Sequence, residues 1–268
     1  MRSNYHSHTT RCGHAVGTEK QYVEAAIAAD YTALGFSDHT PWPGVHSPRM
    51  RMDVDALPGY LAAVRQLKKE YAGRIDIRLG LECEYYPALT GWLQETRQEN
   101  GIEYLIFGNH YEIEEGGFYY GLCSTKAQVK SYLKTTLSGM ATGLYDWLAH
   151  PDVFLRDYPE FDDACRDAAR QICRAAKALS LPLEYNLLAL RASDEGRFIG
   201  IGHPFRAFWE TAAEEGCQVV MNVDAHAPAH LSDTAHYDKG LANVRALGLT
   251  PLECLPKKQM PAVSCVQR

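Results

Sequence analysis

The amino-acid sequence predicts an α/β protein in which the strands of one parallel sheet alternate with helices. Three observations support this class. A chain of 268 residues with 46% hydrophobic and 22% charged side chains can form one large domain with an ordinary core. Short apolar runs alternate with longer amphipathic patterns along the chain, as βα units require. No repeat or linker interrupts this alternation, so we expect a single domain over 1–268 with a tail at 256–268.

The predicted elements follow one another in a regular order. Thr18 and Gln21 form a capping box that opens the first helix, and Gly73 is expected to end the second. Apolar runs predict seven strands, namely the opening segment and 33–39, 75–82, 102–110, 145–150, 181–186 and 217–226. Helical patterns lie at 18–31, 57–73, 89–100, 125–143, 161–180, 204–216 and near 238–248. The sheet is expected to close into a barrel or to stay open and doubly wound, although no Gly-rich phosphate loop follows any strand.

Composition and charge narrow the class of protein. The formal net charge is −6, which argues against a non-specific nucleic-acid binder with a basic face. The eight cysteines include no CxxC pair and favour buried free thiols over a disulfide framework. No basic segment followed by an apolar stretch opens the chain, and no run of 18 apolar residues occurs. We therefore expect a cytoplasmic protein with neither a membrane nor a nucleic acid as partner.

Histidines gather at the ends of the predicted strands. Seven of the 11 histidines stand at or just beyond these ends, which converge on one face of a parallel barrel. His6 and His8 project to the same side of the first strand because side chains alternate along a strand. With two carboxylates, the candidate metal ligands are His6, His8, His14, His39, Glu82, His110, His150, Asp224 and His226. Burying so many titratable groups without a metal is costly, so the sequence predicts a metal centre.

The number and kind of ligands predict the chemistry of this centre. Nine donors exceed what one zinc ion needs and suffice for two or three ions if Glu82 bridges them. A mixed histidine and carboxylate set suits Zn, Fe or Mn. Clustered divalent ions deprotonate a bridging water and clamp the oxygens of a phosphoryl group. Arg191, shortly after the sixth strand, is the expected phosphate contact, and His203 is a further candidate substrate contact.

These residues resemble the polymerase and histidinol phosphatase (PHP) superfamily, and within it the branch of histidinol-phosphate phosphatases. The similarity runs from residue 4 to about 250 through HSHTTRCGH, GFSDHTP, LGLECEYYP, GNHY, AHPD, EYN with the following LR, and VDAHAP. It implies a distorted seven-stranded (β/α) barrel, similar to a TIM barrel, with three metals at the carboxyl rim. It also implies a phosphomonoesterase of histidine biosynthesis that acts on histidinol phosphate, or on another small phosphorylated metabolite.

The resemblance implies a role for each residue. One metal would be held by His6, His8, Glu82 and Asp224, a second by His14, His39 and His226, and a third by Glu82, His110 and His150. Glu82 and Asp224 would be catalytic, Arg191 would hold the substrate phosphate, and Asp38 would orient a ligand or protonate the leaving group. Two departures from the branch, at Asn109 and at Asn222 with Val223, are expected near the substrate.

Three alternative functions remain. An amidohydrolase also begins with HxH and has a late aspartate, but no lysine that could bridge metals occurs between residues 70 and 125. A nuclease of the same superfamily would need a basic channel, which the net charge of −6 does not support. A metal-binding barrel without catalysis would lack a ligand, and none is missing from the set.

Overall fold

A seven-stranded parallel sheet forms the centre of the protein. The computed structural model describes residues 1–112 and 117–254. Each strand pairs in parallel with its neighbours in the sequence, so the order in the sheet is the order in the chain. The strands are β1 (Arg2–Asn4), β2 (Tyr31–Phe36), β3 (Asp76–Cys83), β4 (Tyr104–Phe107), β5 (Trp147–Leu148), β6 (Leu183–Asn186) and β7 (Val219–Asn222).

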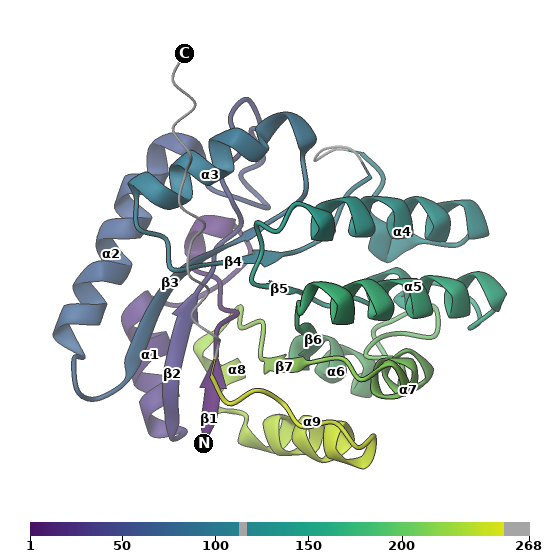
Figure 1. Ribbon diagram of the computed structural model, residues 1–268. Coiled ribbons are helices and arrows are strands. Elements are labelled where there is room, and N and C mark those ends of the chain that lie inside the picture. Colours follow the sequence, from purple (N-terminus) through teal and green to yellow (C-terminus); the bar gives the residue numbers. More distant parts are fainter. Residues whose placement is uncertain (113–116, 255–268) are drawn as a thin grey trace.

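Helices connect the strands and lie on the outside of the sheet (Figure 1). The α-helices are α1 (Glu19–Ala28), α2 (Leu57–Glu70), α3 (Thr90–Glu99), α4 (Lys126–Ala141), α5 (Asp163–Leu179), α6 (Leu187–Asp194), α7 (Arg206–Glu215), α8 (Pro228–Ser232) and α9 (Thr234–Ala246). Short 3-10 helices cover η1 (Thr10–Cys12), η2 (Val54–Ala56), η3 (Pro87–Leu89), η4 (Tyr120–Leu122) and η5 (Val153–Leu155).

The two edges of the sheet, β1 and β7, meet just beyond their last residues. Ser7 and Ala225 form a single parallel bridge there. Two buried asparagines support this seam from opposite sides. Asn222 accepts a backbone N–H from the β1 side over 2.8 Å, and Asn4 accepts one from the β7 side over 2.7 Å. The predicted α/β fold with seven parallel strands is confirmed, and its edges are joined by one bridge and two side chains instead of a full strand ladder.

A small apolar cluster lies inside the curled sheet, and a larger one lies between the sheet and the helices. The hydroxyl of Tyr104 donates to the carbonyls of Tyr5 and Phe36, over 2.8 and 3.0 Å. Gly35 and Gly80 lie against this ring, and a Cβ at Gly80 would come within 2.3 Å of ring carbons. The inner cluster contains Tyr5, Ala33, Tyr104, Ile106, Trp147, Ala149 and Val220. Glycine at positions 35 and 80 therefore makes room for the side chain that fills the interior.

The element boundaries differ from the predicted ones in three respects. The capping box at Thr18 is confirmed, with Gln21 bonding back to the cap. The second helix ends at Glu70, however, and Gly73 lies in the following turn with a φ of 80°. Helices α6 and α8 were not predicted, because α6 is short and directly follows β6 and α8 has only five residues. Strands β2, β4, β5 and β7 end before their predicted ends, because the chain leaves the ladder where the candidate ligands begin, whereas β3 and β6 extend at least to theirs.

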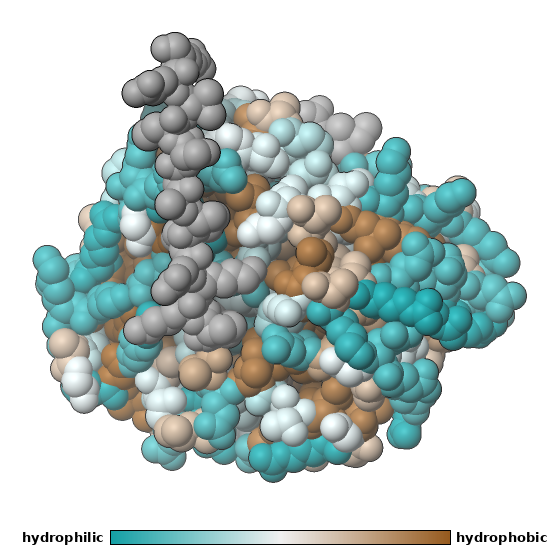
Figure 2. Space-filling model, viewed as in Figure 1, coloured by the Kyte–Doolittle hydropathy of each residue, from teal (hydrophilic) through white to brown (hydrophobic). Residues whose placement is uncertain are grey.

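Hydrophilic residues cover much of the face seen in Figure 2, with apolar patches between them. The seven described cysteines are free thiols, and six of them are buried. Within residues 1–112 and 117–254, no helix is both long and apolar enough to cross a membrane. The predicted tail at 256–268 lies outside the described residues, and the assignment of the whole chain to one domain stays a prediction.

Candidate metal centre

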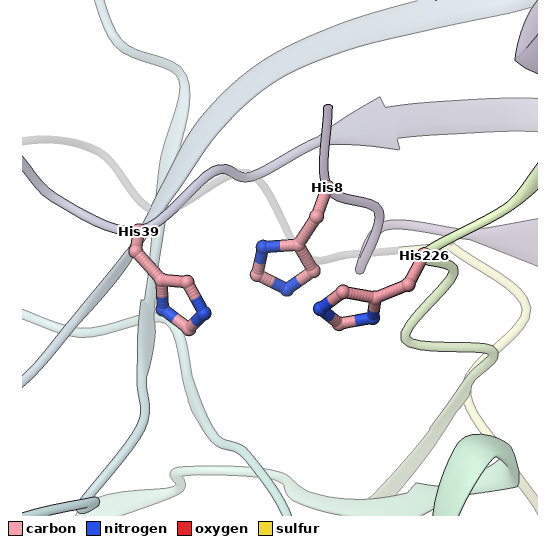
Figure 3. A group of neighbouring side chains, drawn as sticks. All are labelled: His8, His39 and His226. Carbon is pink, nitrogen blue, oxygen red and sulfur yellow. The ribbon is translucent and has the colours of Figure 1, made fainter. Parts of the chain in front are cut away.

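The carboxyl ends of the strands surround a cavity of about 550 Å³. Eight of the nine predicted ligands line this cavity, and the ninth, His6, is fully buried behind them. Figure 3 shows His8, His39 and His226, which come from three distant segments and turn their rings toward one another. The structure thus brings the nine predicted residues to one place.

Glu82 lies at the middle of the group, at the end of β3. Its Oε2 atom is 3.3 Å from Nε2 of His6 and 3.4 Å from Nε2 of His8. The same two nitrogens are 3.5 and 3.3 Å from Oδ1 of Asp224. Two imidazoles and two carboxylates therefore converge on one point, with the ligand types and number of a four-coordinate metal position.

The other oxygen of Glu82 faces a second pair of histidines. Oε1 is 3.2 Å from Nε2 of His110 and 3.1 Å from Nε2 of His150. One carboxylate therefore has separate histidine pairs on its two oxygens. This is the arrangement that a carboxylate bridging two metal ions requires.

His39 lies between the two sides of the group. Its Nδ1 is 3.1 Å from Oε2 of Glu82. It falls within ligand distance of Glu82 and His110, and also of His8 and His226. The resemblance placed His39 with a single metal, whereas the structure puts it within reach of two positions.

His14 and His226 meet at the open side of the group, with their Nε2 atoms 3.0 Å apart. Nδ1 of His14 donates to the carbonyl of Cys12, and Nδ1 of His226 donates to that of Asp224. With their protons on Nδ1, the two Nε2 lone pairs face each other, an arrangement that a shared cation relieves. The Cys12 thiol lies within 4.8 Å of one ring nitrogen of each of these two histidines. Sequence reasoning missed Cys12, although it stands in the HSHTTRCGH motif, because only histidines and carboxylates were counted as ligands.

Several polar atoms at this centre are buried without a hydrogen-bond partner in the part of the chain that the structure describes. They are Nε2 of His6, both ring nitrogens of His8, Nδ1 of His39 and Oδ1 of Asp224. An unsatisfied buried polar group costs about 1–3 kcal/mol. Divalent cations would satisfy Nε2 of His6 and of His8, Nδ1 of His39 and Oδ1 of Asp224, whereas Nδ1 of His8 lies on the side of Asp38. The donor set therefore fits a metal centre.

The charges of the ligands also suit metal binding. Burial raises the pKa of Glu82, but the surrounding histidines, led by His110, bring it well below its ordinary value. Histidines likewise lower the pKa of Asp224 despite its burial. Burial lowers the pKa of His39 well below its ordinary value and that of His226 to about 3. Anionic carboxylates and neutral imidazoles are the forms that bind metal. Burial lowers the pKa of His110, but Glu82 and Glu84 raise it well above its ordinary value, so a metal bound there would displace a proton from this ring.

Glu184, at β6, supports His6 from behind. Its carboxylate is 2.9 Å from Nδ1 of His6 and accepts hydrogen bonds from Trp147, Asn186 and Asn222. Burial lowers the pKa of His6, but nearby carboxylates, Glu184 among them, raise it well above its ordinary value. Carboxylates of this kind fix the tautomer and orientation of a ligating histidine. Sequence reasoning passed over Glu184, although it stands in the EYN motif.

Glu84 supports His110 in the same way. Its Oε1 is 2.9 Å from Nδ1 of His110, and Arg51 and Trp42 donate to the same carboxylate. Burial opposes ionisation of Glu84, but Arg51 and His110 lower its pKa to about 2. The only sequence signal for Glu84 is its place two residues after Glu82, on the same side of the extended chain.

The structure does not bring Arg191 into the cavity. Its guanidinium pairs with Asp233, and the two line a separate small cavity. Arg156 and Arg197 line the metal-centre cavity instead, together with the predicted substrate contact His203. Sequence reasoning missed both arginines because they belong to irregular segments, where no periodicity indicates the direction of a side chain.

Three other predicted positions also lie away from the cavity lining. Asp38 is fully buried, accepts the N–H and hydroxyl of Thr9, and has an oxygen 3.8 Å from Nδ1 of His8. This suits an orienting residue but not a proton donor to substrate. Asn109 donates to groups on α4, and Asn222 belongs to the seam. The expectation that these two asparagines lie near the substrate is therefore not met.

Comparisons with known proteins agree with this geometry. A family model described as the PHP domain matches residues 4–187. The chain is 28% identical over 242 residues to the "Probable histidinol-phosphatase" of Deinococcus radiodurans, which covers 84% of this chain and 86% of that protein. A match to the histidinol-phosphatase of Bacillus subtilis is 34% identical over 86 residues and covers 30% of this chain and 32% of that protein.

A solved structure shares the fold. Histidinol phosphate phosphatase from Lactococcus lactis, in complex with zinc, L-histidinol and phosphate, matches with a TM-score of 0.73 and 20% identity over 93% of this chain and 95% of that chain. At this identity the similarity shows the fold alone. The PHP model spans more than half of the chain and confirms the resemblance carried by the strand-end motifs. The chain therefore belongs to the PHP domain family.

Proposed function

We propose that this protein is a metal-dependent phosphomonoesterase that hydrolyses L-histidinol phosphate to L-histidinol and phosphate. The observation that carries the proposal is the position of Glu82, whose two oxygens face separate sets of histidines within 3.4 Å. The relatives named as histidinol-phosphatases, and the L. lactis enzyme with zinc, L-histidinol and phosphate, support the substrate assignment.

The candidate ligands would hold two or three divalent ions, of which Zn, Mn and Fe suit this donor set. Such ions, when bound, lower the pKa of a water molecule and neutralise phosphoryl oxygens. Glu82 would bridge them, and Glu184 and Glu84 would hold the rings of His6 and His110 in place.

The rest of the cavity suits a small anionic substrate. Its volume of about 550 Å³ lies in the range of small-molecule sites. Arg156 and Arg197 would bind the phosphate, because a guanidinium donates two parallel hydrogen bonds to its oxygens. Phe198 and His203 form part of the wall that would face the leaving group. A cytoplasmic location and the lack of a nucleic-acid partner stay predictions.

The direct test is phosphate release from histidinol phosphate and a panel of small phosphomonoesters by protein loaded with Mn or Zn. We expect a strong preference for histidinol phosphate. Turnover of other phosphomonoesters alone would keep the reaction and replace the substrate. No hydrolysis by fully metal-loaded protein would contradict the proposal and favour the amidohydrolase or non-catalytic alternative.

A Glu82→Gln variant tests the role of the central carboxylate. We expect loss of bound metal and of activity together, because one neutral amide cannot bridge two cations. Metal content by elemental analysis and phosphate release are measured on the same sample. Glu70→Gln, which changes an exposed glutamate paired with Lys20, is the control. Retention of full metal content by Glu82→Gln would refute the bridging role.

A further inference from the structure

His203 forms a buried pair with a carboxylate at the edge of the metal-centre cavity. The histidine lines the cavity but is only 6% exposed, and its ring stacks on Phe198 with 5.2 Å between ring centres. Its Nδ1 is 3.6 Å from Oδ1 of Asp152. This nitrogen has no hydrogen-bond partner among residues 1–112 and 117–254. A shift of a few tenths of an ångström would complete the hydrogen bond.

Asp152 is itself held in a fixed orientation. It is 1% exposed, and its Oδ2 accepts the backbone N–H of Phe205 over 2.9 Å and the indole N–H of Trp209 over 3.0 Å. Both donors belong to the segment that begins α7, directly after His203. The carboxylate therefore has one oxygen engaged and the other turned to the imidazole. With Nδ1 on the Asp152 side, Nε2 is the ring nitrogen that can face the cavity.

Hydrolysis of an alkyl phosphate needs a proton for the departing oxygen, and few groups of the cavity can supply it. The predicted metal ligands are engaged in the centre, and the guanidinium groups of Arg156 and Arg197 do not release protons at neutral pH. Asp38 does not line the cavity. Nδ1 of His230 accepts the backbone N–H of His226, so in this hydrogen bond the ring is the neutral imidazole, which is a much weaker acid than imidazolium. His203 and Tyr119 remain as cavity-lining donors.

Tyr119 is the weaker of these two. Its ring lies beneath the guanidinium of Arg156, 5.8 Å away, and within the described part of the chain its hydroxyl forms no hydrogen bond with a carboxylate. A histidine oriented by a carboxylate is, in contrast, a recurrent arrangement for moving a proton to or from a reacting oxygen.

We propose that His203, oriented by Asp152, is the general acid that protonates the leaving group, an inference that rests on the proposed phosphomonoesterase function. As the bond between phosphorus and the leaving oxygen breaks, the proton on Nε2 passes to that oxygen and an alcohol departs. The attacking water forms the new bond from its oxygen to phosphorus, keeps one proton on the phosphate and releases the other to solvent. His203 regains its proton from solvent before the next turnover.

Leaving-group dependence distinguishes a proton donor from a structural residue. An alkoxide needs a proton to depart, whereas nitrophenolate departs without one. For His203→Asn we expect kcat on histidinol phosphate to fall about 100-fold or more, in the range of lost general acids. Turnover of p-nitrophenyl phosphate and the metal content should stay near those of the unchanged protein. His46→Asn, which removes an exposed histidine paired with Asp53, is the matched control.

A second variant, Asp152→Asn, tests the proposal independently in case His203→Asn does not fold. In Asp152→Asn the amide oxygen can still accept from Phe205 and Trp209, but an N–H₂ now faces Nδ1 of His203. We expect a smaller loss with the same selectivity for the alkyl substrate. Equal losses on both substrates in either variant, or a selective loss in Tyr119→Phe, would overturn the assignment. If the unchanged protein hydrolyses neither substrate, the proposed function fails, and this role fails with it.

Discussion

At the scale of single residues, the site depends on buried charges that are tolerated because each has several partners. An isolated buried carboxylate would take up a proton to avoid the cost of desolvation. Glu82 stays ionised because the histidines around it lower its pKa. Glu84 stays ionised because Arg51 and His110 do the same, despite full burial. The supporting carboxylates are therefore as much a part of the centre as the ligands.

Arg156 and Arg191 provide a paired test of the phosphate contact. Arg156→Ala should raise KM for the phosphomonoester about 10-fold or more, since a hydrogen bond to a charged group contributes about 1.5–3 kcal/mol. Arg191→Ala should leave the kinetics unchanged, because that side chain pairs with Asp233 outside the cavity. Steady-state kinetics check both variants. The reverse result would restore the sequence-based assignment of Arg191.

Glu184→Gln tests the support of His6. The amide loses the negative charge that orients the imidazole, so we expect metal affinity to fall about 10–100-fold, as for other such partners. Competition with a chelator, followed by elemental analysis, measures the change. Glu210→Gln alters an exposed glutamate paired with Arg206 and is the control. An unchanged affinity would show that the neighbouring asparagines and Trp147 suffice to hold His6.

At the scale of elements, the ends of strands carry backbone conformations that side chains rarely adopt. His150 and Asp224 have φ values of 28° and 53°, in the left-handed region. Such conformations cost about 1–3 kcal/mol each and concentrate at functional sites. Here they turn the chain out of the ladder directly after β5 and β7, which points two candidate ligands into the cavity. This explains why β5 and β7 end before their predicted ends.

The N-cap of helix α5, which is remote from the metal centre, is expected to make the stability of the protein depend on pH. Its N-cap, Asp162, accepts the N–H of Cys165 and the hydroxyl of Tyr158. Desolvation raises the pKa of Asp162, but these bonds lower it below the ordinary value. The Asp162 carboxylate therefore binds a proton less readily in the folded state than in the unfolded state. The stabilisation that its ionised form gives the folded state is complete above about pH 3.9 and is lost as the pH falls through the pKa of the folded state.

Asp162→Asn should therefore make the free energy of unfolding depend less on pH in the acid range. Asparagine caps helices about as well as aspartate, so stability near neutral pH should change little. Between about pH 4 and 2, the unchanged protein should lose more stability than the variant, because only the variant lacks the carboxylate. Urea unfolding across this range checks the slope. Parallel curves for the two proteins would refute the contribution of Asp162.

At the scale of the whole molecule, the seam between β1 and β7 decides whether the ligands of both edges meet. His6 and His8 follow one edge, and Asp224 and His226 follow the other. The two asparagines of the seam are both fully buried. Hydrogen-bonding side chains here add to the single backbone bridge between Ser7 and Ala225, and together they hold the two ligand segments side by side.

Removal of either seam side chain should destabilise the fold. Asn222→Ala leaves a buried backbone N–H unsatisfied, so we expect a loss of about 1–3 kcal/mol in the free energy of unfolding. Asn4→Ala should cost a similar amount, and the double variant should lose less than the sum, since both act on one seam. Urea unfolding of the two single variants and the double variant measures this double-mutant cycle. Strictly additive losses in the free energy of unfolding would show that the two asparagines act independently.

The sequence by itself determined the order of the elements, the parallel sheet and the set of nine candidate ligands. These follow from local patterns, because strand periodicity and the shared direction of parallel strands bring strand ends to one face. Only the tertiary structure decided which arginines enter the cavity, which carboxylates support His6 and His110, and that Asp152 faces His203. Those pairings join segments far apart in the chain, and side-chain directions in irregular segments depend on closure of the sheet and not on any local period.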